Sequence, residues 1–405
     1  MEWRAAVKAN LPAAVDLLRQ MIALPSVRGQ EKEISRYLLS RTAGLASAEL
    51  LPLPPSLKRD PDYSFPGDAP PYDGEANLRL TLGDGPGRSL AFNTHMDVVP
   101  PSGKHSDAFL AKEENGRVFG RGAVDAKGQI AVLWLALKTM QDRGFRPGGR
   151  VTIDIVVEEE CGGNGTLWVV RNGLQADGAV VLEPTGLEVV HLVRGAVWFT
   201  VETHGRSGHS GSPGSTASAL KEAIRAMQAI VEVRESLLEK SRREVPAIAG
   251  HPNPMPCTFG MLHSGNWPAT TPSHALLKGV FGFLPPYRRE DIRNLLRESL
   301  NHLQAEIRFD MLNNDPSAVG EDHPLVLCLL NAARRAGIDT QPAFMNASCD
   351  AWRYSQQLNI PAVVFGPGSL AAAHSSEESI AVEDIARAAE ALINLIEIWT
   401  GGSRE

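Results

Sequence analysis

The sequence predicts an α/β fold in which a mostly parallel sheet is covered by helices and interrupted by an inserted α+β domain. The chain has 405 residues, more than the roughly 250 to 300 at which a single hydrophobic core stops growing. Short apolar runs alternate with helical segments towards both ends of the chain, which is the order of a parallel sheet with crossover helices. A central stretch instead has the order βαββαβ, typical of a small domain with helices on one face of an antiparallel sheet.

The elements of the larger domain fall into two blocks. The first has helical periodicity over 11–45, then a Pro-rich segment at 51–74 that we expect to be a long surface loop. Its strands and helices then alternate, with strands at 89–99, 151–160 and 178–184 and helices at 128–144 and 166–174. The second block has a helix at 324–337, a strand at 361–368 and a final helix at 382–400.

The inserted domain occupies the centre of the chain. Its expected order is a strand at 197–205, a helix at 215–240, strands at 257–264 and 274–284, a helix at 288–304 and a strand at 305–312. We therefore expect a discontinuous first domain, residues 1–187 and 312–405, with the second domain at 188–311.

Composition and charge exclude several classes of protein. Hydrophobic residues make up 43% and charged residues 21%, as in an ordinary globular protein rather than a disordered or membrane chain. The net charge is -7 without a basic stripe, so we expect no nucleic-acid partner. No stretch reaches the roughly 18 apolar residues of a membrane span, and the first residues lack the pattern of a secretory signal. The four cysteines, Cys161, Cys257, Cys328 and Cys349, form no CxxC pair, which favours buried thiols in a reducing cytoplasm.

Residues that can bind metals follow nearly every predicted strand of the larger domain. Ligands gather at the carboxyl ends of strands in open α/β sheets. The residues at these ends are His95, Asp97, Glu158, Glu159, Glu160, Glu183 and His374, and Asp125 lies in a Gly-rich turn before a helix. Imidazoles and carboxylates suit zinc or a similar divalent ion, and several shared carboxylates suggest two ions with one bridging ligand. The alternative is that each is a capping or salt-bridged polar residue.

Neighbouring acidic residues have different expected roles. Asp97 lies two residues after His95 and can accept the other imidazole N–H. Glu159 and Glu160 point to opposite sides if the chain is extended there. We assign Glu160 to the metal and Glu159 to the metal-bound water, as general base and then general acid. Glu158 is expected to be an outer or structural residue.

Five motifs carry a family resemblance that covers nearly the whole chain. They are THMDVVP at 94–100, GRGAVDAKG at 120–128, EEECGG at 158–163, LEPT at 182–185 and the late His374. In order and spacing they resemble the zinc-dependent family of aminoacylases, acetylornithine deacetylases, succinyl-diaminopimelate desuccinylases and carboxypeptidase G. The resemblance implies that Asp125 bridges two metal ions, most suitably zinc with cobalt or manganese as alternatives. It implies that His95 and Glu183 complete one ion, that Glu160 and His374 complete the other, and that Glu159 is the base. It also suggests a cis peptide after Asp125.

The inserted domain resembles the lid of that family, which commonly forms a homodimer through a strand edge and a helix. His209 matches the lid histidine that reaches the neighbouring subunit's active site and stabilises the oxyanion, although a histidine in a Gly/Ser loop is often only solvated. The nearby His204 is expected to be solvated or structural. Asn266 matches a lid asparagine that contacts substrate, although asparagine is also an ordinary turn residue.

One position departs from the family pattern. The family commonly has a lid arginine that binds a substrate carboxylate, but this chain has Gly282 in the matching stretch VFGFLPP. Arg194, Arg288, Arg289 or Arg353 could replace it, and we name Arg353 with Asn266 as the substrate-binding candidates. Otherwise the substrate is not a plain N-acyl amino acid with a free α-carboxylate.

The sequence therefore predicts a metal-dependent hydrolase of a small N-acylated amino acid or related amide, releasing a carboxylate and an amine. A dipeptidase or carboxypeptidase with the same metal site is the alternative within hydrolases. From another class, a binding protein that keeps the fold but has lost catalysis is the remaining alternative.

Overall fold

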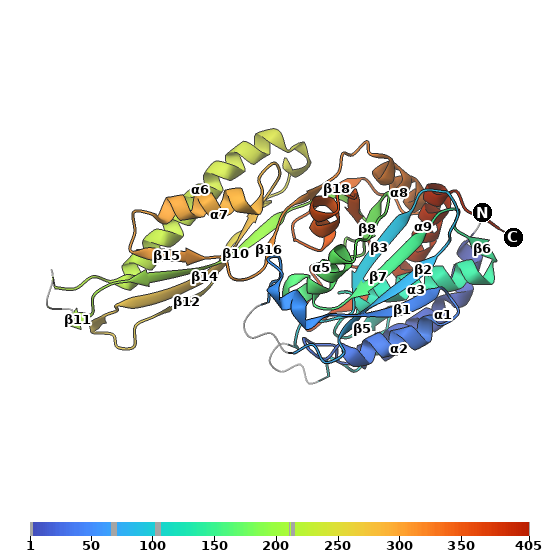
Figure 1. Ribbon diagram of the computed structural model, residues 1–405, viewed down its shortest axis with the longest axis horizontal. Coiled ribbons are helices and arrows are strands. Elements are labelled where there is room, and N and C mark those ends of the chain that lie inside the picture. The colour runs from blue at the N-terminus through green and yellow to red at the C-terminus, as the bar shows by residue number, and fades with distance from the viewer. Residues whose placement is uncertain (1–2, 66–70, 102–106, 210, 212–214, 405) are drawn as a thin grey trace.

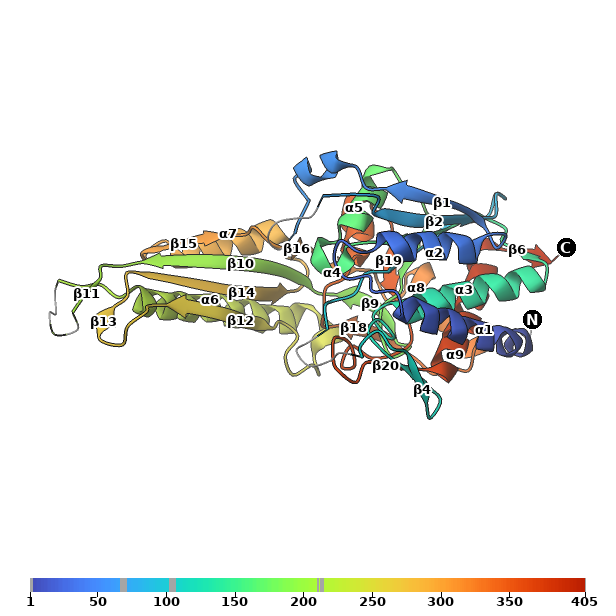
Figure 2. The ribbon, with the colours of Figure 1, turned by 90° about the horizontal axis from the view of Figure 1, so that it is seen from below.

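The computed structural model describes residues 3–65, 71–101, 107–209, 211 and 215–404. It consists of a main domain and a narrow domain that projects from one end of it (Figures 1 and 2). We call the projecting domain the lid. Among the residues described, no helix is long and apolar enough to cross a lipid bilayer.

The main domain contains a large mixed sheet. Four neighbouring strands at its centre, β7, β3, β8 and β19, are parallel, and strands of mixed direction flank them. In sheet order the strands are β1 (Ser47–Pro52), β2 (Ala76–Leu82), β7 (Val151–Val156), β3 (Leu90–His95), β8 (Ala179–Val181), β19 (Ala362–Val364), β9 (Val189–Val193) and β17 (Ser317–Ala318), with β18 (Pro342–Met345) also beside β9. The mostly parallel, helix-covered sheet that the sequence predicts is confirmed.

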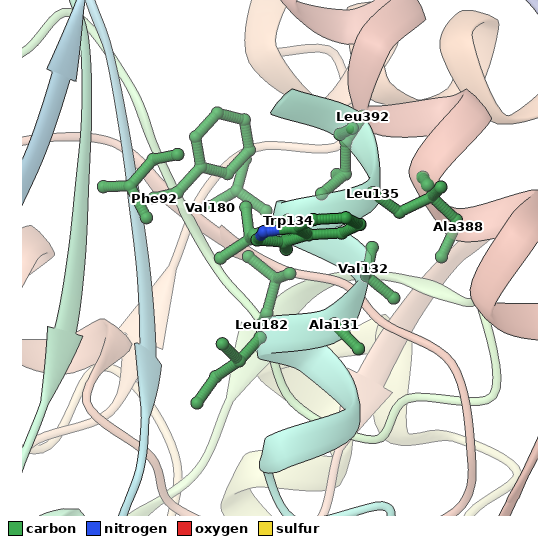
Figure 3. Packing of buried hydrophobic residues seen from close by; sticks show 14 of the residues in the cluster. Phe92, Ala131, Val132, Trp134, Leu135, Val180, Leu182, Ala388 and Leu392 are labelled. Carbon is green, nitrogen blue, oxygen red and sulfur yellow. The ribbon is translucent and has the colours of Figure 1, made fainter. Parts of the chain in front are cut away.

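Helices cover both faces of this sheet. One face packs against α1 (Arg4–Ile22), α2 (Lys32–Thr42), α3 (Lys127–Asp142), α8 (Pro324–Arg335) and α9 (Val382–Thr400). The other face packs against α5 (Asn164–Arg171) and the π-helical turn η3 (Arg353–Gln357). Figure 3 shows α3 between the strands that carry Phe92 and Val180 and the helix that carries Ala388 and Leu392. Because nearly every residue of α3 is buried, its apolar sequence has no exposed face, as expected of a core helix.

Smaller elements complete the main domain. They are η1 (Pro55–Arg59), β4 (Lys112–Glu114), β5 (Arg117–Phe119), β6 (Phe145–Arg146), α4 (Glu159–Gly162), β20 (Ser379–Ala381) and β21 (Ser403–Arg404). The prediction of an irregular loop over 51–74 is partly wrong, because β1 extends to Pro52 and η1 follows it. Residues 66–70 of that segment lie outside the described residues.

The lid is a single antiparallel sheet with both long helices on one face (Figure 1). Its strand order is β12 (Cys257–Ser264), β14 (His274–Phe283), β10 (Gly195–His204) and β15 (Ala305–Arg308), with β16 (Asn313–Asn314) also beside β10. The helices are α6 (Ala219–Glu244) and α7 (Arg289–Leu300), and a short turn, η2 (Pro246–Ile248), follows α6. A small ribbon of β11 (Gly208–His209) and β13 (Thr270–Thr271) lies at the far tip. The expected order βαββαβ is therefore found.

The chain crosses between the domains at positions different from those expected. Strand β9 lies in the range assigned to the inserted domain, yet it pairs with β18 and β19 in the large sheet. Strand β16 lies in the range assigned to the larger domain, yet it pairs with β10 in the lid. The crossings are therefore near Arg194 and Asp315. The apolar sequence continues from β9 into β10 almost without a break, so local pattern could not reveal the change of sheet.

Candidate metal and active site

The carboxyl ends of the parallel strands meet at one edge of the large sheet, beside the lid. His95 ends β3, Glu183 follows β8, and His374 follows β19 after a short loop. The short helix α4 follows β7 and carries Glu159 and Glu160. Asp125 precedes α3, and its peptide bond to Ala126 is cis, as the resemblance suggested. Residues far apart in the sequence thus converge on one edge.

Asp125 lies at the centre of the group, with one imidazole on each carboxylate oxygen. His95 Nε2 is 3.0 Å from Asp125 Oδ1 and 4.0 Å from Glu183 Oε2. His374 Nε2 is 3.2 Å from Asp125 Oδ2 and 3.0 Å from Glu160 Oε1. His95, Asp125 and Glu160 each offer a ligand atom within 4.8 Å of the others, close enough to hold a metal ion.

The electrostatics of this group also suit a bound cation. Burial raises the pKa of Glu159 and of Glu183 well above the usual value, and raises that of Glu160 to about 7. Burial alone would also raise the pKa of Asp125, but hydrogen bonds with His374 and His95 outweigh it and lower the pKa. Several carboxylates thus share a buried space in which the imidazoles of His95 and His374 are their hydrogen-bonded positive partners. Imidazole nitrogen and carboxylate oxygen are the donors that zinc and similar ions accept, so the residues fit the metal.

Asp97 connects His95 to helix α4, which carries Glu159 and Glu160. The nearest acceptor to His95 Nδ1 is the backbone carbonyl of Asp97 at 3.0 Å, and the Asp97 carboxylate is 3.5 Å away. That carboxylate accepts the backbone N–H groups of Glu159 at 3.2 Å and Glu160 at 3.1 Å. Asp97 therefore contacts His95 mainly through its backbone carbonyl, and its carboxylate holds the first turn of α4.

The extended conformation expected for Glu159 and Glu160 is wrong, because both lie in the first turn of α4. Glu158 precedes them with a φ of 58°, and the chain turns there. Its carboxylate accepts hydrogen bonds from the Tyr72 hydroxyl and the Asn164 amide, both at 2.8 Å. The structure thus places Glu158 in a structural contact and leaves Glu160 beside His374, with Glu159 on the adjoining cavity.

A buried ion pair that sequence reasoning missed holds two sides of the metal group together. Arg121 Nη1 lies 2.5 Å from Glu378 Oε2, and both side chains are at most 2% exposed. Glu378 Oε1 accepts the backbone N–H groups of Val124 and Asp125, at 3.2 and 3.3 Å. Arg121 Nη2 donates to the backbone carbonyl of His374 at 3.2 Å. Only the position of Arg121 in the motif GRGAVDAKG could have drawn attention to it, since its partner is 257 residues away.

A cavity of about 430 Å³ lies between this group and the lid. Glu159, Glu160 and His374 line it from the main domain, and Arg194 lines it at the crossing between the domains. The guanidinium of Arg194 donates to the carbonyls of Asn346 at 3.1 Å and Gly195 at 3.2 Å. Burial lowers its pKa to about 10, without an opposing contribution from a carboxylate. Arg194 is therefore a partly buried cation that lines the same cavity as Glu159 and Glu160.

The other candidate arginines are engaged elsewhere. Arg353 is 1% exposed and donates to the carbonyl of Gly162 at 3.0 Å. It is not among the described residues that line the cavity, so the structure does not bring this predicted substrate-binding residue to the site. Arg289 pairs with Asp62 of the main domain at 2.5 Å. Arg288 is the N-cap residue before helix α7, and its backbone N–H donates to the Asp291 carboxylate at 2.8 Å.

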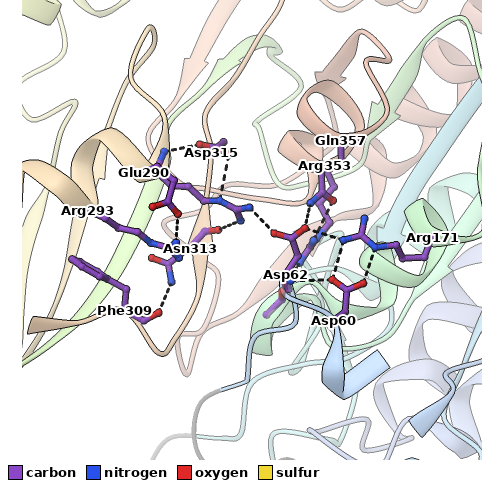
Figure 4. A network of polar contacts seen from close by, with 12 residues as sticks. Asp60, Asp62, Arg171, Glu290, Arg293, Phe309, Asn313, Asp315, Arg353 and Gln357 are labelled. Atoms are coloured by element: carbon purple, nitrogen blue, oxygen red, sulfur yellow. Dashed lines mark hydrogen bonds and ion pairs between the residues drawn. The ribbon is translucent and has the colours of Figure 1, made fainter. Parts of the chain in front are cut away.

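Figure 4 shows that Asp62 is part of an ionic network between the two domains. Its carboxylate receives Arg289 from the lid, and Arg171 at 2.8 Å and Gln357 at 2.9 Å from the main domain. Arg289 also donates its backbone N–H to Asp315, at the return crossing, at 2.7 Å. The network thus joins the lid helix α7, the return crossing at Asp315 and the main domain.

The candidate residues of the lid tip lie away from the metal ligands of the same chain. His209 pairs with Thr270 in the ribbon of β11 and β13, and Asn266 is exposed in the loop between β12 and β13. Figure 1 places this tip at the end of the lid farthest from the main domain. His204 lies opposite His274 in the sheet, with ring centroids 5.8 Å apart.

Comparisons with known proteins agree with this architecture. The family model "Peptidase family M20/M25/M40" matches residues 91–398. The chain is 29% identical over 337 residues to an acetylornithine deacetylase from Myxococcus xanthus, covering 79% of this chain and 83% of that protein. A tripeptidase from Staphylococcus aureus superposes with a TM-score of 0.76 at 17% identity, covering 97% of this chain and 99% of its own. The dipeptidase Dug1p from Saccharomyces cerevisiae does so with a TM-score of 0.77 at 12% identity, covering 100% and 98%. Since the family model spans most of the sequence, the chain belongs to peptidase family M20/M25/M40, a family of hydrolases that act on amide bonds.

Proposed function

We propose that the chain hydrolyses the amide bond of a small N-acylated amino acid with the help of two divalent metal ions, most suitably zinc, with cobalt or manganese as alternatives. The observation that carries the proposal is the placement of Asp125 between two imidazoles, beside a cavity that Glu159 lines. The similarity to proteins named acetylornithine deacetylase supports removal of an acyl group.

In this proposal His95 and Glu183 would hold one ion and Glu160 and His374 the other, and the carboxylate of Asp125 would serve both. Bound metal ions polarise a carbonyl and lower the pKa of a bound water. The chain supplies the proton transfer: Glu159 accepts a proton from the attacking water and later gives it to the leaving amine. Asp97 positions Glu159 by accepting its backbone N–H.

Arg194 is the proposed anchor for a carboxylate of the substrate. Among the described residues its hydrogen-bond acceptors are two carbonyls. Partial burial of a guanidinium with such neutral acceptors is costly, and a bidentate carboxylate would offset that cost. In this proposal Arg194 binds the substrate carboxylate, the role for which this chain has Gly282 in place of an arginine. Its position on the cavity makes it the better candidate than Arg353, which contributes instead to the packing of Gly162.

We further propose a homodimer in which the lid tip of each subunit supplies His209 and Asn266 to the site of the other. Strand β12 is an edge of the lid sheet, with Met261 and Leu262 49% and 41% exposed, and edge strands are common pairing surfaces. A mixture of His209→Ala and Glu159→Ala chains tests it. Mixed dimers contain one site with both residues intact, so activity should reappear on subunit exchange. Continued inactivity of verified mixed dimers would contradict the exchange of His209.

The function is tested by Glu159→Gln, which keeps the size of the side chain and removes its basicity. We expect turnover to fall by at least about 100-fold, within the range of general base catalysis, with metal content unchanged. Glu33→Gln, on the exposed face of α2, is the control and should retain activity. Unchanged turnover of Glu159→Gln would remove Glu159 from the reaction.

A dipeptidase or carboxypeptidase is the second candidate, supported by the peptidase folds among the similar structures. N-acetyl, N-succinyl and dipeptide substrates of the same amino acid separate the two activities. If the chain is instead a binding protein that has lost catalysis, it should take up metal but turn over none of these substrates. All four cysteines are unpaired, which supports a cytoplasmic location as part of the proposal.

A further inference from the structure

The cavity beside Glu159 has an apolar wall on its lid side, and this wall carries an inference that rests on the proposed function. We propose that the site selects amides that combine one carboxylate with an apolar substituent, and that Trp198 determines this selectivity. The apolar residues of this lid wall are Ala196, Trp198, Val280, Met311 and Leu312, and Thr258 and Asn314 are its uncharged polar members.

The register of the lid sheet directs these side chains into the cavity. Trp198 of β10 lies opposite Val280 of β14. The alternating residues Val197, Phe199 and Phe281 are buried in the core beneath the lid helices. Because successive side chains of a strand point to opposite faces, Trp198 and Val280 lie on the face without helices. Their partial burial leaves apolar surface available to a substrate.

The charged residues of the cavity leave no partner for a second positive charge. Among the described residues that line it, the carboxylates are Glu159 and Glu160, which the proposed function assigns to the base and the metal. Arg194 is a cation and repels another cation. An ammonium group held against the lid wall would therefore lose water without gaining a carboxylate, which is unfavourable.

The lid wall also lacks a charged side chain at position 282, which is glycine. It lies opposite Ala196 in the register and is therefore on the same face as Val280. A Cβ atom at Gly282 would come 2.9 Å from Pro256 Cδ and 3.0 Å from Pro256 O, so a longer side chain does not fit without movement of that segment. The lid wall thus has no charged side chain at this position. The amide preferred here should differ from acetylornithine, whose side chain carries an ammonium group.

N-acetyl-L-norleucine and N2-acetyl-L-ornithine test the proposal, because their side chains have equal length and differ by a methyl in place of an ammonium group. With the metal-loaded enzyme, kcat/KM should be at least about 10-fold higher for the norleucine derivative. A preference for the ornithine derivative would overturn the inference while leaving the proposed function intact. Absence of cleavage of either compound, and of dipeptides and other N-acyl amino acids, would instead refute the proposed function.

Variants assign the selectivity to Trp198. Trp198→Ala should lower kcat/KM for N-acetylnorleucine by about 10-fold and for N-acetylglycine by less than about 3-fold, whereas Trp198→Phe should keep most of the selectivity. Val280→Asp should shift the preference towards the ornithine derivative by supplying a carboxylate. Leu276→Ala, on the same face of β14 but outside the cavity lining, is the control. An equal loss on all substrates in Trp198→Ala, or no shift in Val280→Asp, would overturn the role of the lid wall.

Discussion

Replacement of Glu378 by glutamine should weaken both the fold and the metal site, and the structure gives the size of the effect. Glutamine can still accept the N–H groups of Val124 and Asp125 through its oxygen. Its amide nitrogen, however, replaces the oxygen that faces Arg121 Nη1 at 2.5 Å, so two donors oppose each other. Removal of one partner of a buried ion pair costs about 3 to 5 kcal/mol, and we expect this loss in the free energy of unfolding.

The same substitution should lower metal affinity by about 10- to 100-fold, as observed for residues that support metal ligands. The reason is that the pair fixes the backbone of Asp125 on one side and of His374 on the other. Denaturant unfolding of the metal-free protein measures the stability, and competition with a chelator measures the metal affinity.

A matched control separates these two effects. Asp154 is fully buried in β7 and pairs with Arg79 at 2.8 Å, away from the ligand group. Asp154→Asn should also destabilise the protein, by somewhat less because Arg79 is 15% exposed, but should leave metal affinity unchanged. Equal losses of metal affinity in both variants would show that general loosening, rather than the contacts of Glu378, weakens the site. Unchanged stability and affinity in Glu378→Gln would refute the reasoning altogether.

Three further predictions concern other parts of the molecule. Burial, with a smaller contribution from Asp97, raises the pKa of Glu31 from 4.5 to about 9. The stability that the neutral Glu31 side chain contributes is therefore complete below pH 4.5 and is lost as the pH rises to 9. Glutamine stays neutral, so Glu31→Gln should raise the unfolding free energy of the metal-free protein by roughly 3 kcal/mol at pH 7 and by little at pH 5. Denaturant titrations measure both values, and equal effects at the two pH values would contradict the prediction. A double-mutant cycle of Asp62→Asn and Arg289→Gln should give a coupling of about 1 kcal/mol in the unfolding free energy, and Asp62→Asn should enlarge the radius of gyration in X-ray scattering; additivity would show that the contact does not join the domains. Removal of metal by a chelator should lower the melting temperature, and metal at 1,000 times Kd should restore about 4 kcal/mol; a melting temperature independent of metal would contradict the proposed ligand set.

Local sequence predicted those parts of the fold whose cause is local. Strand β12 and helix α9 coincide with the ranges expected from apolar periodicity. The convergence of His95, Glu183 and His374 followed from a general rule for the carboxyl ends of parallel strands, whereas the central place of Asp125 was implied by the family resemblance. These inferences needed only the order of elements and the residue types at their ends.

Other features depend on partners distant in sequence, which a pattern of residues cannot reveal. The assignment of Arg353 to substrate rested on its chemistry alone, whereas its burial follows from a contact with Gly162, 191 residues away. The turn at Glu158 also gave no local signal, because a φ of 58° is uncommon for glutamate. Tertiary contacts decided both positions.

Arg194 lies between the lid and the cavity that Glu159 lines. It lies where the chain leaves β9 of the main domain and enters β10 of the lid, and it lines the same cavity as Glu159. Asn314, at the return crossing, lines that cavity too and lies 3.4 Å from Ser348 of the main domain. Any rotation of the lid must bend the chain at these two crossings, because they are its covalent connections to the main domain. Such a rotation would move the proposed carboxylate anchor and Trp198 together relative to Asp125, so lid orientation and substrate position are coupled by the path of the backbone.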